Sequence, residues 1–266
     1  MTLPSFKRAV FKRNPLFSVS AQMRFHPILR IQTETPALFQ EKVRSQFPGY
    51  AMVDPLAITI PPGIPEAIQA AVRANMVTSL NLSFERVHRF TSADEVWTVQ
   101  ISQESVTMSC KEYPRWERFR VEFQSVLAAF VSIYSPPFAT MVGLRYQNAI
   151  ERSKLGLIGV PWSSLLNAFI AAEFACPGLS EADILSDLHR FEFREGNDKI
   201  IVQHGMATNG LTNELVYSID SNLNATGKVE LSDVHDRLDQ LNKHSGSLFR
   251  LCITDQLYTS LEPEPI

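Results

Sequence analysis

The sequence lacks the cysteine patterns of disulfide-rich and zinc-binding proteins. Its three cysteines, Cys110, Cys176 and Cys252, are far apart in the chain and show no paired spacing. Disulfide-stapled domains and zinc knuckles need closely spaced cysteines. We therefore expect no disulfide framework and a reducing compartment. Cys252 lies in an apolar segment, so we expect its thiol to be buried and unreactive.

Long hydrophobic runs are also missing. The longest apolar stretch, residues 126–134, is shorter than the roughly 20 residues that cross a bilayer as a helix. The basic start of the chain is followed by Asn14-Pro15 and a mixed polar stretch, which is not the pattern of a signal peptide. We expect no membrane association and a cytoplasmic location.

The sequence contains no motif for nucleophilic catalysis or phosphate binding. There is no Gly-x-Ser-x-Gly elbow, and residues 156–159 lack the lysine and the spacing of a phosphate loop. The six histidines are scattered at positions 26, 88, 189, 204, 235 and 244, and none shows a metal-ligand spacing on a helix. We expect no metal site and no cofactor, and these absences favour a binding protein over an enzyme.

A strong excess of charge of either sign is absent too, since the net charge is -3. Whole-molecule attraction to nucleic acid or anionic membranes is therefore not expected. Charge is nevertheless uneven, because six basic residues precede Glu34, the first acidic one: Lys7, Arg8, Lys12, Arg13, Arg24 and Arg30. This basic lead-in either touches an anionic partner or is a solvated tail beside an edge strand.

Among the features that are present, residues 140–151 alternate as a β-strand does. The alternation predicts an inner face of Val142, Leu144, Tyr146 and Ile150 and an outer face of Arg145, Gln147 and Glu151. Residues 17–26 show the same pattern, and Met23-Arg24-Phe25 parallels Leu144-Arg145-Tyr146. Asn148 falls on the inner face, where its amide must be hydrogen-bonded.

Periodicity and turn signals predict the other elements. We expect helices over residues 37–47, 66–78, 116–134, 161–174 and 180–185, and from 233 to 261 with a break at Gly246. We expect further strands over 82–90, 96–102, 105–111, 188–194, 199–205 and 214–220, and a packed loop over 50–65. Residues 113–119 interleave aromatic and basic residues as single-strand binders do. Trp116 and Phe119 join the apolar stripe of the helix over 116–134, however, which favours core packing.

Both halves of the chain thus run strand, helix, three strands, long helix. Short links between successive strands require antiparallel pairing. The sequence predicts an α+β fold whose antiparallel sheet comes from two tandem β-α-β-β-β-α units, residues 1–138 and 139–266, with long helices packed on one face of a single pseudo-symmetric body. A chance likeness of the two halves is the alternative, because their sequence identity is low.

Four segments carry a resemblance to a known family: Asn14-Pro15-Leu16, Tyr113-Pro-Arg-Trp-Glu-Arg-Phe119, Gly143-Leu-Arg-Tyr-Gln-Asn148 and Leu248-Phe-Arg-Leu-Cys-Ile-Thr-Asp255. The chain resembles an uncharacterised, sporadically distributed family of prokaryotic proteins. An acidic residue often follows the leading Asn-Pro segment in that family, whereas Phe17-Ser18-Val19 has none. The resemblance implies prokaryotic origin but no activity. Sporadic distribution is typical of mobile defence or toxin-antitoxin modules, in which a protein partner is encoded nearby.

The candidate site residues are Arg24 and Arg145, with Gln22, Gln147 and His26 on the same outer face of the predicted sheet. Two guanidinium groups brought together would bind phosphate or carboxylate. The alternative is a cross-strand ion pair, with Glu151 or Glu192 as partner, or a solvated face.

These residues lead to three hypotheses of function. The first is a non-enzymatic binding or interaction protein that engages a protein partner or an anionic ligand through the outer face. The second is an enzyme acting on a phosphorylated or nucleotide substrate, with the arginines as an oxyanion clamp. The third is nucleic-acid binding through the basic lead-in, which would weaken steeply with salt. The sequence leaves homo-oligomer formation open.

Overall fold

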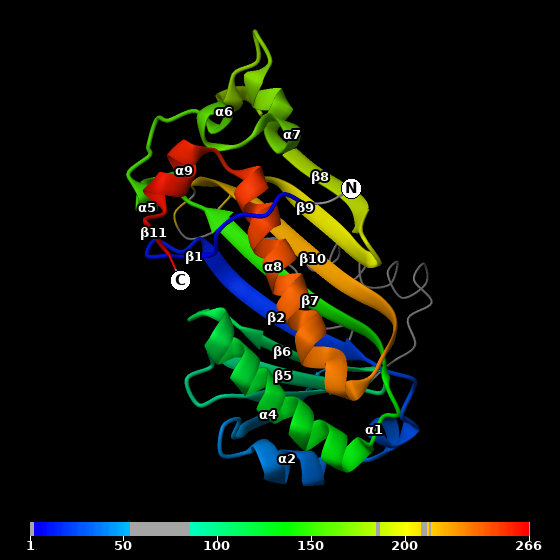
Figure 1. Cartoon of the computed structure of the whole chain (residues 1–266). Helices are drawn as coiled ribbons and strands as arrows, with labels where there is room; N and C mark the ends of the chain where they lie inside the picture. The colour runs from blue at the N-terminus through cyan, green and yellow to red at the C-terminus, as the bar shows by residue number, and fades with distance from the viewer. Residues whose placement is uncertain (1–2, 54–85, 185–186, 209–211, 213, 266) are drawn as a thin grey trace, which may run out of the picture.

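The computed structural model describes residues 3–53, 86–184, 187–208, 212 and 214–265. Nine strands in this part of the chain form one sheet: β2 (Leu16–Arg24), β3 (Gly49–Val53), β4 (Val87–Thr91), β5 (Trp97–Ser102), β6 (Ser105–Cys110), β7 (Ala139–Ile150), β8 (Asp187–Glu195), β9 (Asp198–Thr208) and β10 (Leu215–Val229). Their order is β3-β4-β5-β6-β2-β7-β10-β9-β8 (Figure 1). Each neighbouring pair is antiparallel, so the predicted mixed α+β fold with a large antiparallel sheet is confirmed.

The two strands that the sequence singled out are neighbours at the centre of this sheet. Val19 on β2 lies opposite Tyr146 on β7, and Ala21 lies opposite Leu144. Val19, Ala21 and Leu144 are completely buried. Because side chains alternate across a strand, burial of these residues directs Arg145 and its alternate neighbours to the opposite face.

Helix α4 (Trp116–Tyr134) has the bounds that its periodicity predicts. Its apolar residues recur every three or four positions and form one buried stripe, which comprises Trp116, Phe119, Phe123, Val126, Leu127 and Phe130. The helix ends at Ser135, which adopts a left-handed conformation (φ 45°) and is followed by Pro136-Pro137. Proline cannot continue a helix, so the chain leaves α4 there and enters β7.

Helix α8 (Val234–Cys252) packs against β7 and β10 (Figure 1). The predicted break at Gly246 is wrong, because the helix runs through that residue. A polar tie joins α8 to α4: the indole Nε1 of Trp116 donates to Asp239 Oδ1 at 2.7 Å, and Arg120 Nε donates to Asp239 Oδ2 at 3.1 Å. Trp116 and Phe119 are buried, which confirms the prediction of core packing.

The predicted continuous helix over 161–174 is also wrong. The structure has α6 (Trp162–Leu165), α7 (Ala168–Ala171) and a 3-10 turn (Ala172–Ala175) in its place. Asn167 interrupts the helical pattern because its amide donates to the carbonyl oxygens of Leu251 and Ile253, at 2.7 and 3.0 Å. Phe169 in α7 is half exposed.

Several short elements escaped the prediction. Residues 9–11 of the basic lead-in form β1 (Ala9–Phe11), which pairs with β11 (Pro263–Pro265), so this part is not a solvated tail. Strand β3 occupies the start of the predicted loop 50–65, and the predicted helix 66–78 lies outside the described residues. The remaining helical elements are α1 (Leu29–Thr33), α2 (Ala37–Val43), α5 (Arg152–Leu155), α9 (Asp255–Ser260) and 3-10 turns at Glu181–Asp183 and Leu231–Asp233.

The structure also bears on the predictions about Cys252 and about membrane-spanning helices. Cys252 is buried, as expected, and burial raises the pKa of its thiol to about 12. Burial likewise raises the pKa of Cys110 to about 11. None of the described helices combines the length and apolar character needed to cross a bilayer.

Candidate functional site

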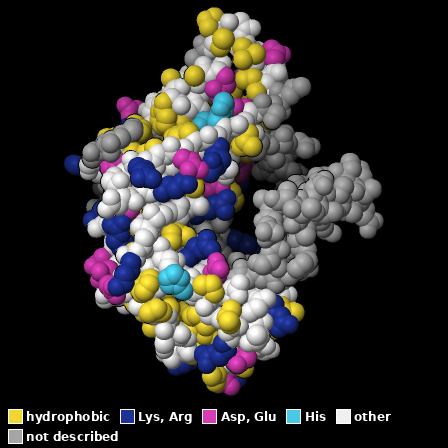
Figure 2. Space-filling model, turned by 90° about the vertical axis from the view of Figure 1, so that its right-hand side faces the viewer, with side chains coloured by type: hydrophobic (Ala, Val, Ile, Leu, Met, Phe, Trp, Pro, Cys, Tyr) yellow, Lys and Arg dark blue, Asp and Glu magenta, His cyan; other side chains and the backbone are white. Residues whose placement is uncertain are grey.

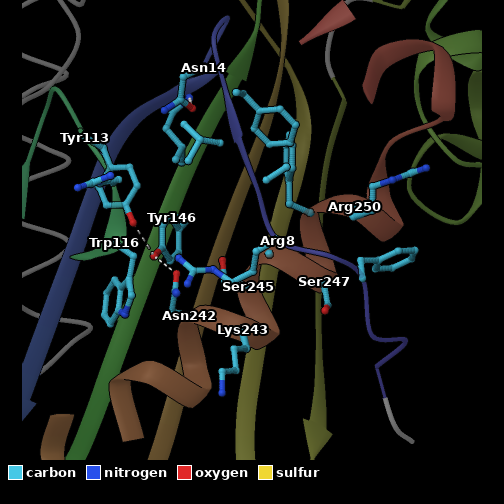
Figure 3. Close-up of a pocket in the computed structure, with 18 of the residues that line it drawn as sticks. Arg8, Asn14, Tyr113, Trp116, Tyr146, Asn242, Lys243, Ser245, Ser247 and Arg250 are labelled. Carbon is cyan, nitrogen blue, oxygen red and sulfur yellow. Dashed lines mark hydrogen bonds between the residues drawn. The ribbon is translucent and has the colours of Figure 1, made fainter. Parts of the chain in front are cut away.

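A pocket of about 440 Å³ lies between β1, the middle of α8 and the helix-facing side of β7 (Figure 3). We call it the basic pocket. Four separate parts of the chain line it: residues 5–16, 113–116, Tyr146 with Asn148, and 242–258. Strand β7 supplies its floor through Tyr146, which reaches Asn242 on α8, and through Asn148, which lies two residues along on the same face of the strand. The walls are aromatic and include Phe6, Phe11, Tyr113, Trp116, Phe249 and Tyr258.

Two tyrosines and an asparagine form a hydrogen-bonded chain in this pocket. The Tyr146 hydroxyl donates to Asn242 Oδ1 at 2.7 Å, and the Tyr113 hydroxyl lies 3.4 Å from the Tyr146 oxygen (Figure 3). The two rings meet edge to face, with centroids 5.8 Å apart. Burial raises the pKa of both phenols, so both stay protonated at neutral pH. Since Tyr146 donates to Asn242, Tyr113 donates to Tyr146 and keeps its own oxygen free to accept.

The charged residues of the pocket are all basic. Lys7, Arg8, Arg115, Lys243 and Arg250 line it, and no acidic residue is among the described lining residues. Arg8 forms an ion pair with Glu117 at 3.1 Å and Arg250 forms one with Asp255, but neither acid lines the pocket. The guanidinium of Arg250 also lies over the rings of Phe6 and Tyr258, at 5.5 and 4.6 Å from their centroids. Cations on an aromatic wall suit an anion that carries a flat or apolar part.

The outer face of the sheet carries the site residues predicted from the sequence. Tyr146 faces α8, so Arg145 and Gln147 face away from that helix. Arg145 forms a bidentate ion pair with Asp220 on β10, and Gln147 Nε2 donates to the same carboxylate at 3.3 Å. The hydrogen bond with Asp220 raises the pKa of Arg145. The cross-strand ion pair is therefore present, but its partner is Asp220 and not Glu151 or Glu192.

The other predicted site residues lie apart from Arg145. Arg24 pairs with Glu104 at 2.8 Å, Gln22 donates to Thr107 at 2.9 Å, and the ring of His26 meets Phe138 edge to face. Arg24 is opposite Met141 and Arg145 is opposite Ser20. Four residues of strand separate the two arginines, which is roughly 13 Å. They do not form one shared anion site.

Figure 2 gives a wider view of the surface, on which basic side chains run through the middle of the visible face with acidic ones between them. The ion pairs of β8 and β9 are of this kind, since Glu192 pairs with both Arg190 and Lys199. Each charge in these two ion pairs is partly neutralised by its partner. In the basic pocket, by contrast, no acidic residue is among the described lining residues.

Removal of Arg145 is expected to destabilise the protein more than removal of Arg24. Asp220 is only 14% exposed, so Arg145→Leu leaves its carboxylate with the weak Gln147 contact and costs about 1–2 kcal/mol. The Arg24–Glu104 pair is exposed, and Arg24→Leu costs about 0.5 kcal/mol or less. Urea denaturation measures both. The double variant Arg145→Leu, Asp220→Asn should regain part of the loss; equal losses for the two single variants would contradict the ranking.

Sequence reasoning identified parts of the basic pocket without placing them together. Lys7 and Arg8 belong to the basic lead-in, and Tyr113 and Arg115 belong to the aromatic and basic segment ahead of α4. The prediction for Asn148 is confirmed, because its buried amide donates to the carbonyl oxygen of Ile219 at 3.3 Å. Nothing in the sequence indicated that α8 would face these residues.

No family model matches the chain, and no curated protein matches it in sequence. The resemblance to the sporadically distributed prokaryotic family therefore stays a prediction.

Proposed function

We propose that this protein is a binding protein and that its basic pocket takes a small anionic ligand with a planar or apolar part. The observation that carries the proposal is the lining itself: five cations, no acidic residue among the described lining residues, and walls of aromatic rings. The anionic group lies near Lys243 and Arg115 at the rim. The apolar part lies on the rings of Tyr113 and Phe249 and on the floor at Tyr146.

The chemistry of the lining favours binding over catalysis. Proton transfer near neutral pH normally uses an imidazole, a carboxylate or a thiol. The described lining residues include none of these groups. The phenols of Tyr113 and Tyr146 stay protonated at neutral pH because burial raises their pKa, so neither is available there as a general base. An enzyme acting on a phosphorylated or nucleotide substrate is the alternative, and it would need a catalytic group from elsewhere.

The proposal places the anion at the basic pocket and not at the outer face of the sheet. Arg24 and Arg145 are each paired with a carboxylate inside the chain. A ligand at either arginine would have to displace that carboxylate. By contrast, Lys7, Arg115 and Lys243 form no ion pair with the described residues, so their charge is available to a ligand.

Charge reversal at the rim is expected to weaken binding of an aromatic anion about tenfold. Two probes report this: fluorescence of 8-anilinonaphthalene-1-sulfonate, and calorimetry with AMP against adenosine. In the variant Lys243→Glu, Arg115→Glu, each reversed charge removes about 0.5–1 kcal/mol of attraction to the probe, and about 1.4 kcal/mol corresponds to a tenfold change. AMP should bind more tightly than adenosine, which lacks the phosphate.

The matched control is Lys42→Glu, Arg44→Glu, which makes the same charge change at exposed residues at the C-terminal end of α2, away from the pocket. It should bind both probes as the unmodified protein does. Equal affinity for AMP and adenosine, unchanged binding in the rim variant, or no binding of either probe would overturn the proposal. Conversion of AMP during the incubation would overturn the preference for binding over catalysis.

We also infer that the chain consists of two related halves, residues 1–138 and 139–266, in one pseudo-symmetric body with α4 and α8 on the same side of the sheet. The strand order supports this inference, because β2-β6-β5-β4 in one half corresponds to β7-β10-β9-β8 in the other. α4 follows β6 and α8 follows β10 along the chain. A backbone superposition of the two halves that fails to align these elements in this order would contradict the inference.

A further inference from the structure

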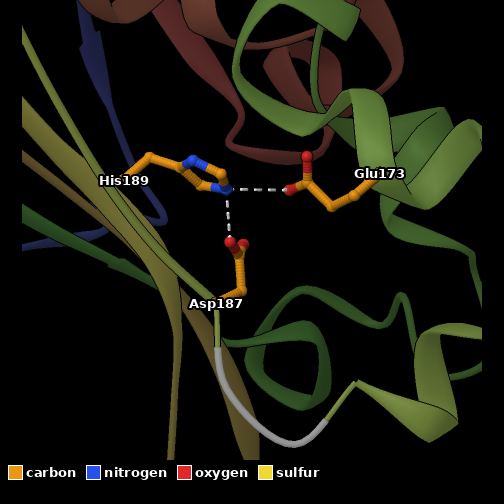
Figure 4. Close-up of side chains that lie close together, drawn as sticks. All are labelled: Glu173, Asp187 and His189. Carbon is orange, nitrogen blue, oxygen red and sulfur yellow. Dashed lines mark ion pairs between the residues drawn. The ribbon is translucent and has the colours of Figure 1, made fainter.

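A second group of polar side chains lies where β8 begins, outside the lining of the basic pocket. Asp187 is the first residue of β8, His189 follows two residues later, and Glu173 comes from the 3-10 turn Ala172–Ala175. The three side chains converge on one point from the strand and from the turn (Figure 4). His189 Nε2 lies 2.5 Å from Asp187 Oδ1 and 3.9 Å from Glu173 Oε1.

The carboxylates of this cluster are incompletely satisfied. Asp187 Oδ2 and Glu173 Oε1 are buried and accept no hydrogen bond from the described residues. The Asp187 side chain is only 5% exposed. A buried carboxylate oxygen without a partner is costly unless a cation compensates it. The cluster therefore holds two carboxylates and one imidazole, and one oxygen of each carboxylate has no hydrogen bond from the described part of the chain.

A second imidazole, that of His204, lies beside the cluster but pairs with neither acid. The ring of His204 stacks on that of His189 with centroids 5.2 Å apart, because the pairing of β8 with β9 places the two residues opposite each other. Among the described residues, no Lys or Arg forms an ion pair with Glu173 or Asp187, and His189 is the basic side chain that pairs with both acids.

The surroundings hold the cluster in place. His204 Nδ1 lies 2.7 Å from the Tyr217 hydroxyl, which in turn donates to the carbonyl oxygen of Ile170 at 2.5 Å. Tyr217 also contacts Phe174, the neighbour of Glu173, edge to face. One buried tyrosine thus links the strand that carries His204 to the segment that carries Glu173. Such surrounding contacts orient metal ligands in proteins.

We propose that Glu173, Asp187 and His189 form a binding site for a divalent transition metal ion of the Zn²⁺ class. All three ligand atoms lie within 4.8 Å of one another. Tetrahedral ligands at about 2.1 Å from zinc are roughly 3.4 Å apart. The His189–Asp187 separation has to widen and the His189–Glu173 separation to shorten, each by less than about 1 Å. The ligand oxygens of Asp187 and Glu173, which lie within 4.8 Å of each other, have to approach by up to about 1.4 Å. Rotation of the half-exposed His189 ring supplies part of this change.

The ligand set also indicates the kind of metal. One imidazole with two carboxylates suits Zn²⁺ and its first-row neighbours, whereas Mg²⁺ and Ca²⁺ prefer oxygen ligands alone. Three protein ligands leave a fourth position, which the half-exposed side of His189 opens to water. The site joins the segment over residues 168–175 to the edge of the sheet, so a bound ion would strengthen that attachment.

Zinc titration of chelator-treated protein tests the site. Calorimetry should give one Zn²⁺ ion per chain with micromolar or tighter affinity, and Zn²⁺ should raise the melting temperature more than Mg²⁺ does. Asp187→Asn and His189→Gln should each weaken binding about 100-fold. Co²⁺ should give the visible absorption of a four-coordinate ion. A variant that loses this absorption but keeps its circular dichroism has lost the site, whereas an unfolded variant loses both signals.

Two matched variants serve as controls. Glu192→Gln makes the same charge change as Asp187→Asn on the same strand, outside the cluster, and His26→Gln removes a distant histidine. Both should bind Zn²⁺ as the unmodified protein does. Failure of the unmodified protein to bind Zn²⁺, equal binding of Mg²⁺, or full Zn²⁺ affinity in folded His189→Gln would overturn the proposal. None of these outcomes bears on AMP binding, so the two sites are tested separately.

Discussion

Replacing Gly205 with alanine is expected to lower the free energy of unfolding by about 3 kcal/mol or more. Gly205 has φ +150°, which side chains rarely tolerate. A Cβ atom at this position would lie 2.0 Å from the backbone oxygen of Asp187 and 2.7 Å from its carbonyl carbon. Both are backbone atoms of β8, so they can move away only if the pairing of β8 with β9 is disturbed.

Other glycines provide the controls for this prediction. Gly227 also has a positive φ of 101°, but a Cβ there meets no atom within 4 Å, so Gly227→Ala reports strain without collision. Gly246 is helical and equally open, and Gly246→Ala should be neutral or slightly stabilising. Urea denaturation should rank the losses Gly205 above Gly227 above Gly246. Equal stability of the Gly205 and Gly246 variants would contradict the close approach of Gly205 to the backbone of β8 at Asp187.

The same substitution has a consequence for the proposed metal site. Asp187 is the residue with which the added Cβ collides, and it supplies the most buried ligand of the cluster. Displacement of β8 should therefore weaken Zn²⁺ binding in Gly205→Ala, while AMP binding at the basic pocket should remain. Calorimetry with each probe on the folded variant distinguishes the two effects.

Replacing Trp162 with alanine is expected to cost about 3–5 kcal/mol. Trp162 is completely buried, and its ring lies 5.7 Å from that of Tyr217. The guanidinium of Arg152 lies over the Trp162 ring, 4.5 Å from its centroid. Truncation leaves a cavity between α6 and β10 and removes the cation–π contact. The segment that carries Glu173 should then detach from the sheet more readily.

Two variants calibrate this expectation. Trp162→Phe keeps an aromatic ring and should lose clearly less stability than Trp162→Ala. Phe169→Ala truncates a half-exposed ring in the same segment and should cost under about 1 kcal/mol. Denaturant unfolding followed by circular dichroism measures all three. A loss for Trp162→Ala as small as that for Phe169→Ala would mean that this tryptophan does not anchor the segment.

The elements predicted best are those with the strongest local pattern. The helix over 116–134 has the predicted bounds, and the strand predicted over 140–151 is observed as Ala139–Ile150. Their periodicity is set by which residues must leave water, and it repeats over many residues. Proline at both positions after Ser135 marks the boundary between them.

The elements predicted worst depend on contacts from far away in the chain. The pattern over 161–174 is compatible with one helix, yet Asn167 bonds to carbonyl groups more than 80 residues later and interrupts it. β1 is three residues long and exists because β11 pairs with it. Short edge strands carry too little periodicity to be recognised before their partner is known.

The candidate sites divide in the same way. The sequence alone placed Lys7 and Arg8 in a basic lead-in and Arg115 in a segment of alternating aromatic and basic residues. It also placed Arg145 on an outer face and Asn148 on an inner one. Strand register decided that Arg145 pairs with Asp220 and that His189 stacks on His204. It also placed Arg24 four residues of strand away from Arg145.

The sequence by itself determined the α+β class, the antiparallel sheet, the central strands and the long helix α4, because these follow from local periodicity and turn chemistry. Only the tertiary structure decided which residues meet. The basic pocket draws on four segments of the chain, and the Glu173, Asp187 and His189 cluster joins a 3-10 turn to a strand. Such sites arise from pairing and packing across long sequence separations, which no local pattern encodes.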